Sequence, residues 1–225
     1  MRSLLLVFAV LAQSPAQAID AVEICFNYGC SGGARVTFPD ARLDEVRALL
    51  GAASDAPGER DAIAVAVGRL YRIAGEQSPI AADRAGNYLD GGAPGRMDCI
   101  DHSTTTGRFL ALLESRGWLR FHRVVEPARR TRLIFQHFAA VIEELAPPAP
   151  APAPHAVPDH VPLLLALCDC QNATDDIAQV REQETQTPPR PGRRFAVDSW
   201  FVEHGEPAVV LPLEEWMNGE GPNVQ

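Results

Sequence analysis

The sequence contains no lysine: its twenty basic residues are all arginine, against 29 acidic residues. The protein therefore has no lysine amine with which to cross-link itself. The formal net charge of −9 argues against binding to nucleic acid, because such binding normally requires a basic patch. The chain also lacks a second long apolar run beyond the one at its start, so we expect no membrane span in the mature form.

The first 18 residues have the three features of a cleavable secretory signal. Arg2 precedes an apolar run at 4–12, and a polar, small-residue stretch then ends in Ala-Gln-Ala at 16–18. This ending suits signal peptidase, whose subsites admit small side chains, and the apolar run is shorter than the roughly 20 residues that span a bilayer. The residue directly after the cleavage point is Ile19 and not cysteine, which argues against a lipid anchor. We therefore expect a periplasmic or secreted protein that begins near Ile19, after cleavage near Ala18.

The chain has five cysteines, so at least one thiol of an exported protein is free or bonded to another molecule. Cys25 and Cys30 flank a Phe-Asn-Tyr-Gly segment whose Asn and Gly favour a turn that brings the two sulfurs together. A disulfide within Cys168-x-Cys170 would be strained, so these two could equally pair with the first set, and the sequence does not choose among the connectivities. Cys99 stands apart from both sets and is the candidate free thiol.

Hydrophobic periodicity predicts an α+β fold with N-terminal helices packed on a small antiparallel sheet. A short strand is expected at 35–38, and glycine-rich residues 82–96 are expected to be a loop that delivers the chain to Cys99. Three helices are expected: from the cap Asp40 to Gly51, from about Glu59 to Gly75, and from Ile100 to a stop at Gly117.

The second half of the chain is divided by a segment rich in proline and polar residues. We predict one α+β domain made of residues 19–145 and 195–225, with 146–194 as a partly disordered insertion before the last strands. Strands are expected at 195–201 and 208–211. Residues 132–142 alternate as a strand does but also fit a helix.

The densest cluster of reactive side chains surrounds Cys99. A thiol is a nucleophile when ionised, and a helix start favours the thiolate through its unpaired N–H groups and the macrodipole. The alternative is a buried cysteine that acts as a small hydrophobe. The neighbouring residues Asp98, Asp101 and His102 are ionisable, however, and such neighbours are unusual for a core position. Because two nearby carboxylates would raise the pKa of the thiol, a catalytic role requires a histidine partner.

His137 is the histidine most deeply embedded in apolar sequence. It could be a core histidine bonded to backbone, but Asp198, in another apolar strand, also needs a charged or hydrogen-bonding partner. We predict Cys99, His137 and Asp198 as catalytic residues. The candidate supporting residues are Asp101, Asn87 and Trp200, and the candidate oxyanion donors are Asn87, Tyr88 and the Cys99 backbone N–H.

This order of residues resembles the transglutaminase-like superfamily of cysteine enzymes, which includes bacterial cysteine peptidases. In that superfamily a cysteine opens a helix, often in a Cys-x-Asp setting, and His and Asp occupy neighbouring strands. Residues 98–101, 135–142 and 196–198 match these three elements. His and Asp are usually separated by a short hairpin, and here the insertion accounts for the longer spacing, since loop closure cost rises only logarithmically with length. The segment from Cys25 to Trp216 also looks like a group of uncharacterised proteobacterial exported proteins.

The resemblance implies a papain- or transglutaminase-like core and acyl transfer by a cysteine nucleophile. The expected enzyme is a cysteine peptidase or amidase that hydrolyses or transamidates a protein, peptide or cell-envelope amide, with no cofactor and no metal. A zinc site at Cys168, Cys170 and His160 is disfavoured by its ligand spacing. The alternative is a catalytically inactive periplasmic binding or assembly protein of the same fold.

Overall fold

The computed structural model describes residues 19–90, 92–133, 135–145 and 192–222. The predicted signal at 1–18 lies outside the described residues, as does most of the predicted insertion with Cys168, Cys170 and His160. The domain boundaries therefore stay a prediction.

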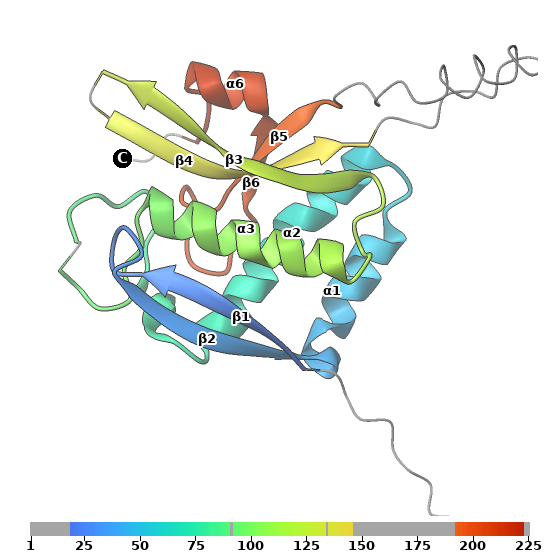
Figure 1. Cartoon of the computed structure of the whole chain (residues 1–225), viewed down its shortest axis with the longest axis horizontal. Coiled ribbons are helices and arrows are strands. Elements are labelled where there is room, and N and C mark those ends of the chain that lie inside the picture. The colour runs from blue at the N-terminus through green and yellow to red at the C-terminus, as the bar shows by residue number, and fades with distance from the viewer. Residues whose placement is uncertain (1–18, 91, 134, 146–191, 223–225) are drawn as a thin grey trace, which may run out of the picture.

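The described residues form two antiparallel sheets with helices between and beside them (Figure 1). A hairpin pairs β1 with β2, and a four-stranded sheet has the order β3-β4-β5-β6. The predicted α+β class is confirmed. The strands are β1 (Ile19–Phe26), β2 (Gly32–Pro39), β3 (His122–Arg132), β4 (Phe135–Glu144), β5 (Arg194–Asp198) and β6 (Val209–Pro212). The helices are α1 (Asp40–Ala52), α2 (Ala56–Gly75), α3 (Cys99–Ser115) and α6 (Leu213–Asn218), with a 3-10 turn η1 (Pro79–Ala82).

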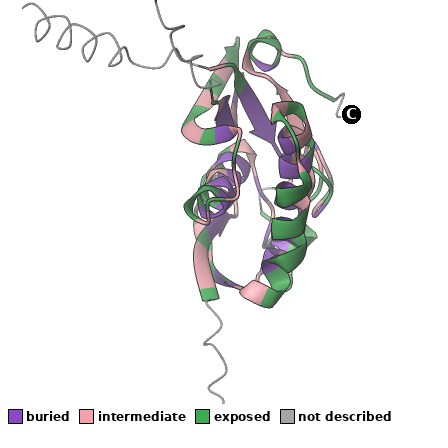
Figure 2. Ribbon diagram, turned by 90° about the vertical axis from the view of Figure 1, so that its right-hand side faces the viewer, coloured by how far each residue is buried: buried purple, intermediate pink, exposed green. Residues whose placement is uncertain are grey.

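Helix α3 lies between the two sheets, with the β1–β2 hairpin on one side and β4 on the other (Figure 1). Its buried stripe includes Phe109, Leu110 and Leu113, as the periodicity predicts. Phe109 meets Phe38 of β2 edge to face, with ring centroids 5.7 Å apart. Figure 2 shows the buried residues gathered where the elements face one another. Packing on both sides thus fixes α3, and with it the first residue of the helix, Cys99.

Residues 132–142, for which strand and helix were both open, contain the end of β3 and most of β4. The two strands are antiparallel, with Arg130 opposite His137 and Arg132 opposite Phe135. Directly opposite residues share a face of the sheet. Arg130 therefore lies on the same face as His137.

Several sequence expectations need correction. Gly51 does not end α1: its φ is not positive, and the helix continues to Ala52. Strand β1 was not predicted, because its first half is half-exposed and lacks a clear alternation. The strand expected at 195–201 ends at Asp198, where the carboxylate accepts the Trp200 N–H and the chain turns away.

Candidate active site

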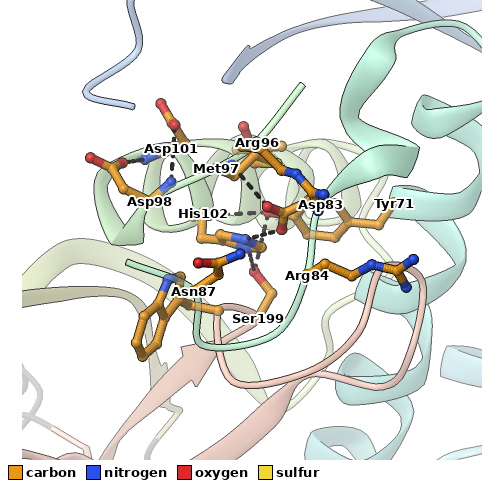
Figure 3. Close-up of polar contacts among 12 residues, drawn as sticks. Tyr71, Asp83, Arg84, Asn87, Arg96, Met97, Asp98, Asp101, His102 and Ser199 are labelled. Atoms are coloured by element: carbon orange, nitrogen blue, oxygen red, sulfur yellow. Dashed lines mark hydrogen bonds and ion pairs between the residues drawn. The ribbon is translucent and has the colours of Figure 1, made fainter. Parts of the chain in front are cut away.

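Cys99 is the first residue of α3, as its neighbourhood predicted. Asp98 caps the helix: its Oδ1 accepts the N–H groups of Ile100 at 3.0 Å and Asp101 at 2.9 Å. Asp101 reciprocates by accepting the Asp98 N–H at 3.1 Å, which completes a capping box. Figure 3 shows the two aspartates at the start of the helix. The box holds the Cys99 backbone in a defined first turn.

The β1–β2 turn docks on the same two carboxylates. Cys25 and Cys30 form a disulfide across this turn, as one of the predicted pairings required. Tyr28, Gly29 and Cys30 all have left-handed φ values, of 65°, 62° and 58°, and consecutive N–H groups in such a turn can converge on an anion. Asp101 accepts the N–H groups of Tyr28 at 2.8 Å and Cys30 at 2.6 Å, and Asp98 accepts that of Gly29 at 2.9 Å. The predicted supporting residue Asp101 thus fastens the turn to α3.

The Cys99 thiol is half-buried and donates to the Gln136 carbonyl, with Sγ and O 3.8 Å apart. Burial raises the pKa of this thiol, and the charges of Asp98 and Asp198 raise it further, whereas the Phe138 backbone opposes them. The thiol is therefore protonated at neutral pH in the resting protein. The lower pKa that a helix start favours is outweighed by burial and by the two carboxylates, which raise the pKa of the thiol.

His137 and Asp198 lie on the neighbouring strands β4 and β5 and are hydrogen-bonded, with Nε2 and Oδ2 2.6 Å apart. Asp198 is buried and has two further donors. The Trp216 indole N–H donates to Oδ2 at 2.8 Å, and the Trp200 backbone N–H donates to Oδ1 at 3.1 Å. Because a carboxylate only accepts, Nε2 of His137 carries a proton.

The other ring nitrogen of His137, Nδ1, is buried and has no hydrogen-bond partner among the described residues. The ring lies among the aromatic rings of Trp200, Phe201 and Trp216, with centroids 5.0, 5.2 and 5.5 Å away. In the neutral imidazole with its proton on Nε2, Nδ1 presents a lone pair. Within the described part of the chain no hydrogen bond joins His137 to Cys99, although Cys99 contacts Gln136, the residue before His137.

The remaining predicted residues have different positions. Trp200 packs against both His137 and Tyr88, with ring centroids 5.0 and 4.7 Å away. Among the described residues no hydrogen bond joins Asn87 to Cys99. Its side-chain oxygen accepts the Leu89 N–H and its carbonyl accepts the Tyr28 hydroxyl.

Sequence reasoning missed two residues of this site. Trp216 is fully buried and holds Asp198 from α6. Arg130 lies over the Trp216 ring, with Cζ 4.6 Å from the centroid, and donates to the Trp216 and Glu220 carbonyls. For Trp216, the only sequence signal is a tryptophan in an acidic C-terminal segment, and that signal is weak. Arg130 could be found only from the strand register, which the sequence does not reveal.

Asp83, His102 and Ser199 form a separate Asp-His-Ser arrangement (Figure 3). His102 bonds to Ser199 Oγ through Nδ1 and to Asp83 Oδ2 through Nε2, both at 2.8 Å. Ser199 is only 5% exposed and also bonds to Thr106 and Tyr71. The adjoining cavity, about 10 Å³, is too small for an acyl group. This network therefore joins the Asp83 loop, α3 and the turn after Asp198, and so supports the position of Asp198.

Comparisons with protein-family models, curated proteins and solved structures found no match for this chain. The transglutaminase-like resemblance therefore stays a prediction from the sequence. In the described ranges no helix is long and apolar enough to cross a membrane.

We expect Asp98→Asn to accelerate alkylation of Cys99 by iodoacetamide at pH 7.5 about threefold, because one of the negative charges that oppose the thiolate is removed. Asparagine is also a good N-cap, so the helix start is retained. The rates are measured by mass spectrometry of the Cys99 peptide, and the acceleration should shrink as the pH rises. Asp55→Asn, which alters the N-cap of α2, is the matched control. Equal rates for both variants and the wild type would contradict the electrostatic role of Asp98.

Proposed function

We propose that this protein is an exported acyl-transfer enzyme that hydrolyses or transamidates an amide, with Cys99 as nucleophile, His137 as base and Asp198 as the residue that orients the imidazole. One observation carries the proposal. His137 is held by a buried carboxylate through one nitrogen, while its other buried nitrogen is unpartnered among the described residues, on a strand whose backbone contacts the Cys99 thiol.

The raised pKa of Cys99 decides how the proton moves. A protonated thiol needs a general base at the moment of attack, so the thiol turns from the Gln136 carbonyl to His137 Nδ1, which takes the proton as sulfur attacks the amide carbonyl. Asp198 stabilises the resulting imidazolium. The imidazolium then returns the proton to the leaving amine, and water or a second amine resolves the thioester.

The oxyanion of the tetrahedral intermediate needs a hydrogen-bond donor. The Cys99 backbone N–H is in the first turn of α3, where no carbonyl of a preceding helical turn is available to accept it. It therefore supports the assignment of Cys99 N–H as oxyanion donor, ahead of Asn87, whose side-chain oxygen is already engaged.

Two further features of the structure support the proposed export and the proposed transglutaminase-like core. The Cys25–Cys30 disulfide suits an oxidising compartment. A helix opened by cysteine and packed against an antiparallel sheet, with His and Asp on adjacent strands, is the arrangement expected of a transglutaminase-like core. A periplasmic or secreted location narrows the substrate to a protein, peptide or cell-envelope amide.

We expect iodoacetamide to label Cys99 in the native protein near neutral pH, and His137→Ala to slow this labelling at least tenfold, because the variant lacks the general base. Labelling is followed by mass spectrometry of the Cys99 peptide, with Cys99→Ser to identify labelling elsewhere. His204→Ala is the matched control, since His204 is half-buried and bonds to neither Cys99 nor Asp198. The rival function, an inactive binding or assembly protein, predicts that Cys99 reacts only after denaturation.

A further inference from the structure

A cavity of about 180 Å³ adjoins the proposed catalytic histidine. His137, Gln136, Arg130, Arg132 and the rings of Tyr88 and Phe201 contribute to its wall. The carbonyl of Gln136, one of these lining residues, also accepts the Cys99 thiol at 3.8 Å, so Gln136 connects the cavity to the nucleophile. Burial and the charges of Cys99 and Asp198 raise the pKa of Tyr88, whereas Arg130 lowers it.

The two arginines of this wall are positively charged. Among the described residues neither Arg130 nor Arg132 forms an ion pair. The charge of Asp198 acts on Arg130, but the Asp198 oxygens already accept three N–H groups. Arginine remains protonated even when half-buried. In the described ranges the cavity therefore presents positive charge that no ion pair compensates, in a protein that is acidic as a whole.

Arg130 is also held in place before any ligand arrives. Its guanidinium donates to the Trp216 and Glu220 carbonyls and lies over the Trp216 ring. These contacts occupy only part of its five N–H donors. A guanidinium fixed in this way loses little freedom when it binds an anion, and its planar fork matches a carboxylate.

We propose that Arg130 and Arg132 form a subsite for a carboxylate, so that the amide substrate of Cys99 carries a negative charge close to the bond that is cleaved. This inference rests on the proposed function. The aromatic rings of the wall would pack on the aliphatic part of the substrate. The carboxylate would come either from an acidic side chain or from a free main-chain terminus.

The test compares two reagents that alkylate thiols by the same displacement but differ in charge, iodoacetate and iodoacetamide. We expect the ratio of their rates at Cys99 to exceed the ratio at the denatured protein about tenfold, because the anionic reagent is bound beside the thiol. Arg130→Gln and Arg132→Gln should each return the ratio toward the denatured value. Arg129→Gln, one residue along β3 and therefore on the opposite face, is the matched control and should retain the wild-type ratio.

The source of the carboxylate is tested by protection of Cys99 from iodoacetamide. N-acetylalanine supplies a free terminal carboxylate, and the α-amide of N-acetylglutamate supplies a side-chain carboxylate; one of them should protect, and Arg132→Gln should abolish that protection. Arg132 is exposed, so its variant tests the subsite even if Arg130→Gln does not fold. Labelling by both reagents with a ratio that ignores both arginines would overturn the subsite alone. A native protein that neither reagent labels at Cys99 would overturn the proposed function and the subsite together.

Discussion

Replacing Asp198 with Asn is expected to lower the free energy of unfolding by about 3 kcal/mol and to slow alkylation of Cys99 at least tenfold. The carboxylate of Asp198 accepts three donors: His137 and Trp216 at Oδ2 and the Trp200 N–H at Oδ1. A carboxamide has only one acceptor oxygen, so in either orientation its NH₂ group faces at least one N–H donor. The variant also loses the charge that favours protonation of His137 during attack.

Chemical denaturation at neutral pH measures the first effect, and the Cys99 labelling rate measures the second. Asp61→Asn, at an exposed position on α2, should change neither quantity. Trp216→Phe separates the two effects further, because it retains an aromatic ring beside His137 but removes one donor to Asp198. An Asp198→Asn protein as stable as the wild type would show that the three hydrogen bonds do not depend on the charge.

The candidate site could be predicted from the sequence where local chemistry dictates it. The Asp98-Cys99-Ile100-Asp101 pattern contains its own capping box, so Cys99 at a helix start follows from residues within one turn. His137 and Asp198 are polar residues in apolar strands, and such residues must find partners. In the structure each is the hydrogen-bond partner of the other, with Nε2 of His137 and Oδ2 of Asp198 2.6 Å apart.

Features that depend on distant pairing could not be predicted in this way. Arg130 joins the site because the strand register places it opposite His137. Asp83, His102 and Ser199 meet from three separate elements, and no local pattern connects them. The direction of the Cys99 pKa shift likewise depends on how deeply the thiol is buried, whereas the helix start alone favours a lower value.

The largest expected loss of stability is at Glu59, a buried residue in the first turn of α2. Its carboxylate accepts the N–H groups of Arg120 at 2.6 Å and Phe121 at 2.9 Å, and bonds to His122 Nδ1 at 2.8 Å. It thereby ties α2 to the start of β3. We expect Glu59→Ala to cost about 3–5 kcal/mol, because three donors lose their acceptor in the interior. Denaturant unfolding at pH 7 measures the loss, and Glu45→Gln, at an exposed position, should leave the unfolding midpoint unchanged.

The pH dependence distinguishes the charge of Glu59 from its size. Burial alone would raise the pKa of Glu59, but the bonds from His122, Arg120 and Phe121 outweigh burial and hold the pKa below its ordinary 4.5. A carboxylate with a lowered folded-state pKa contributes stability above its ordinary value, and the contribution is lost as the pH falls through the lowered value. Between pH 7 and pH 3 the wild type should therefore lose more stability than Glu59→Gln, which cannot titrate at this position. If the two proteins differ in stability by the same amount at both pH values, the carboxylate stabilises the junction of α2 and β3 by its shape and not by its charge.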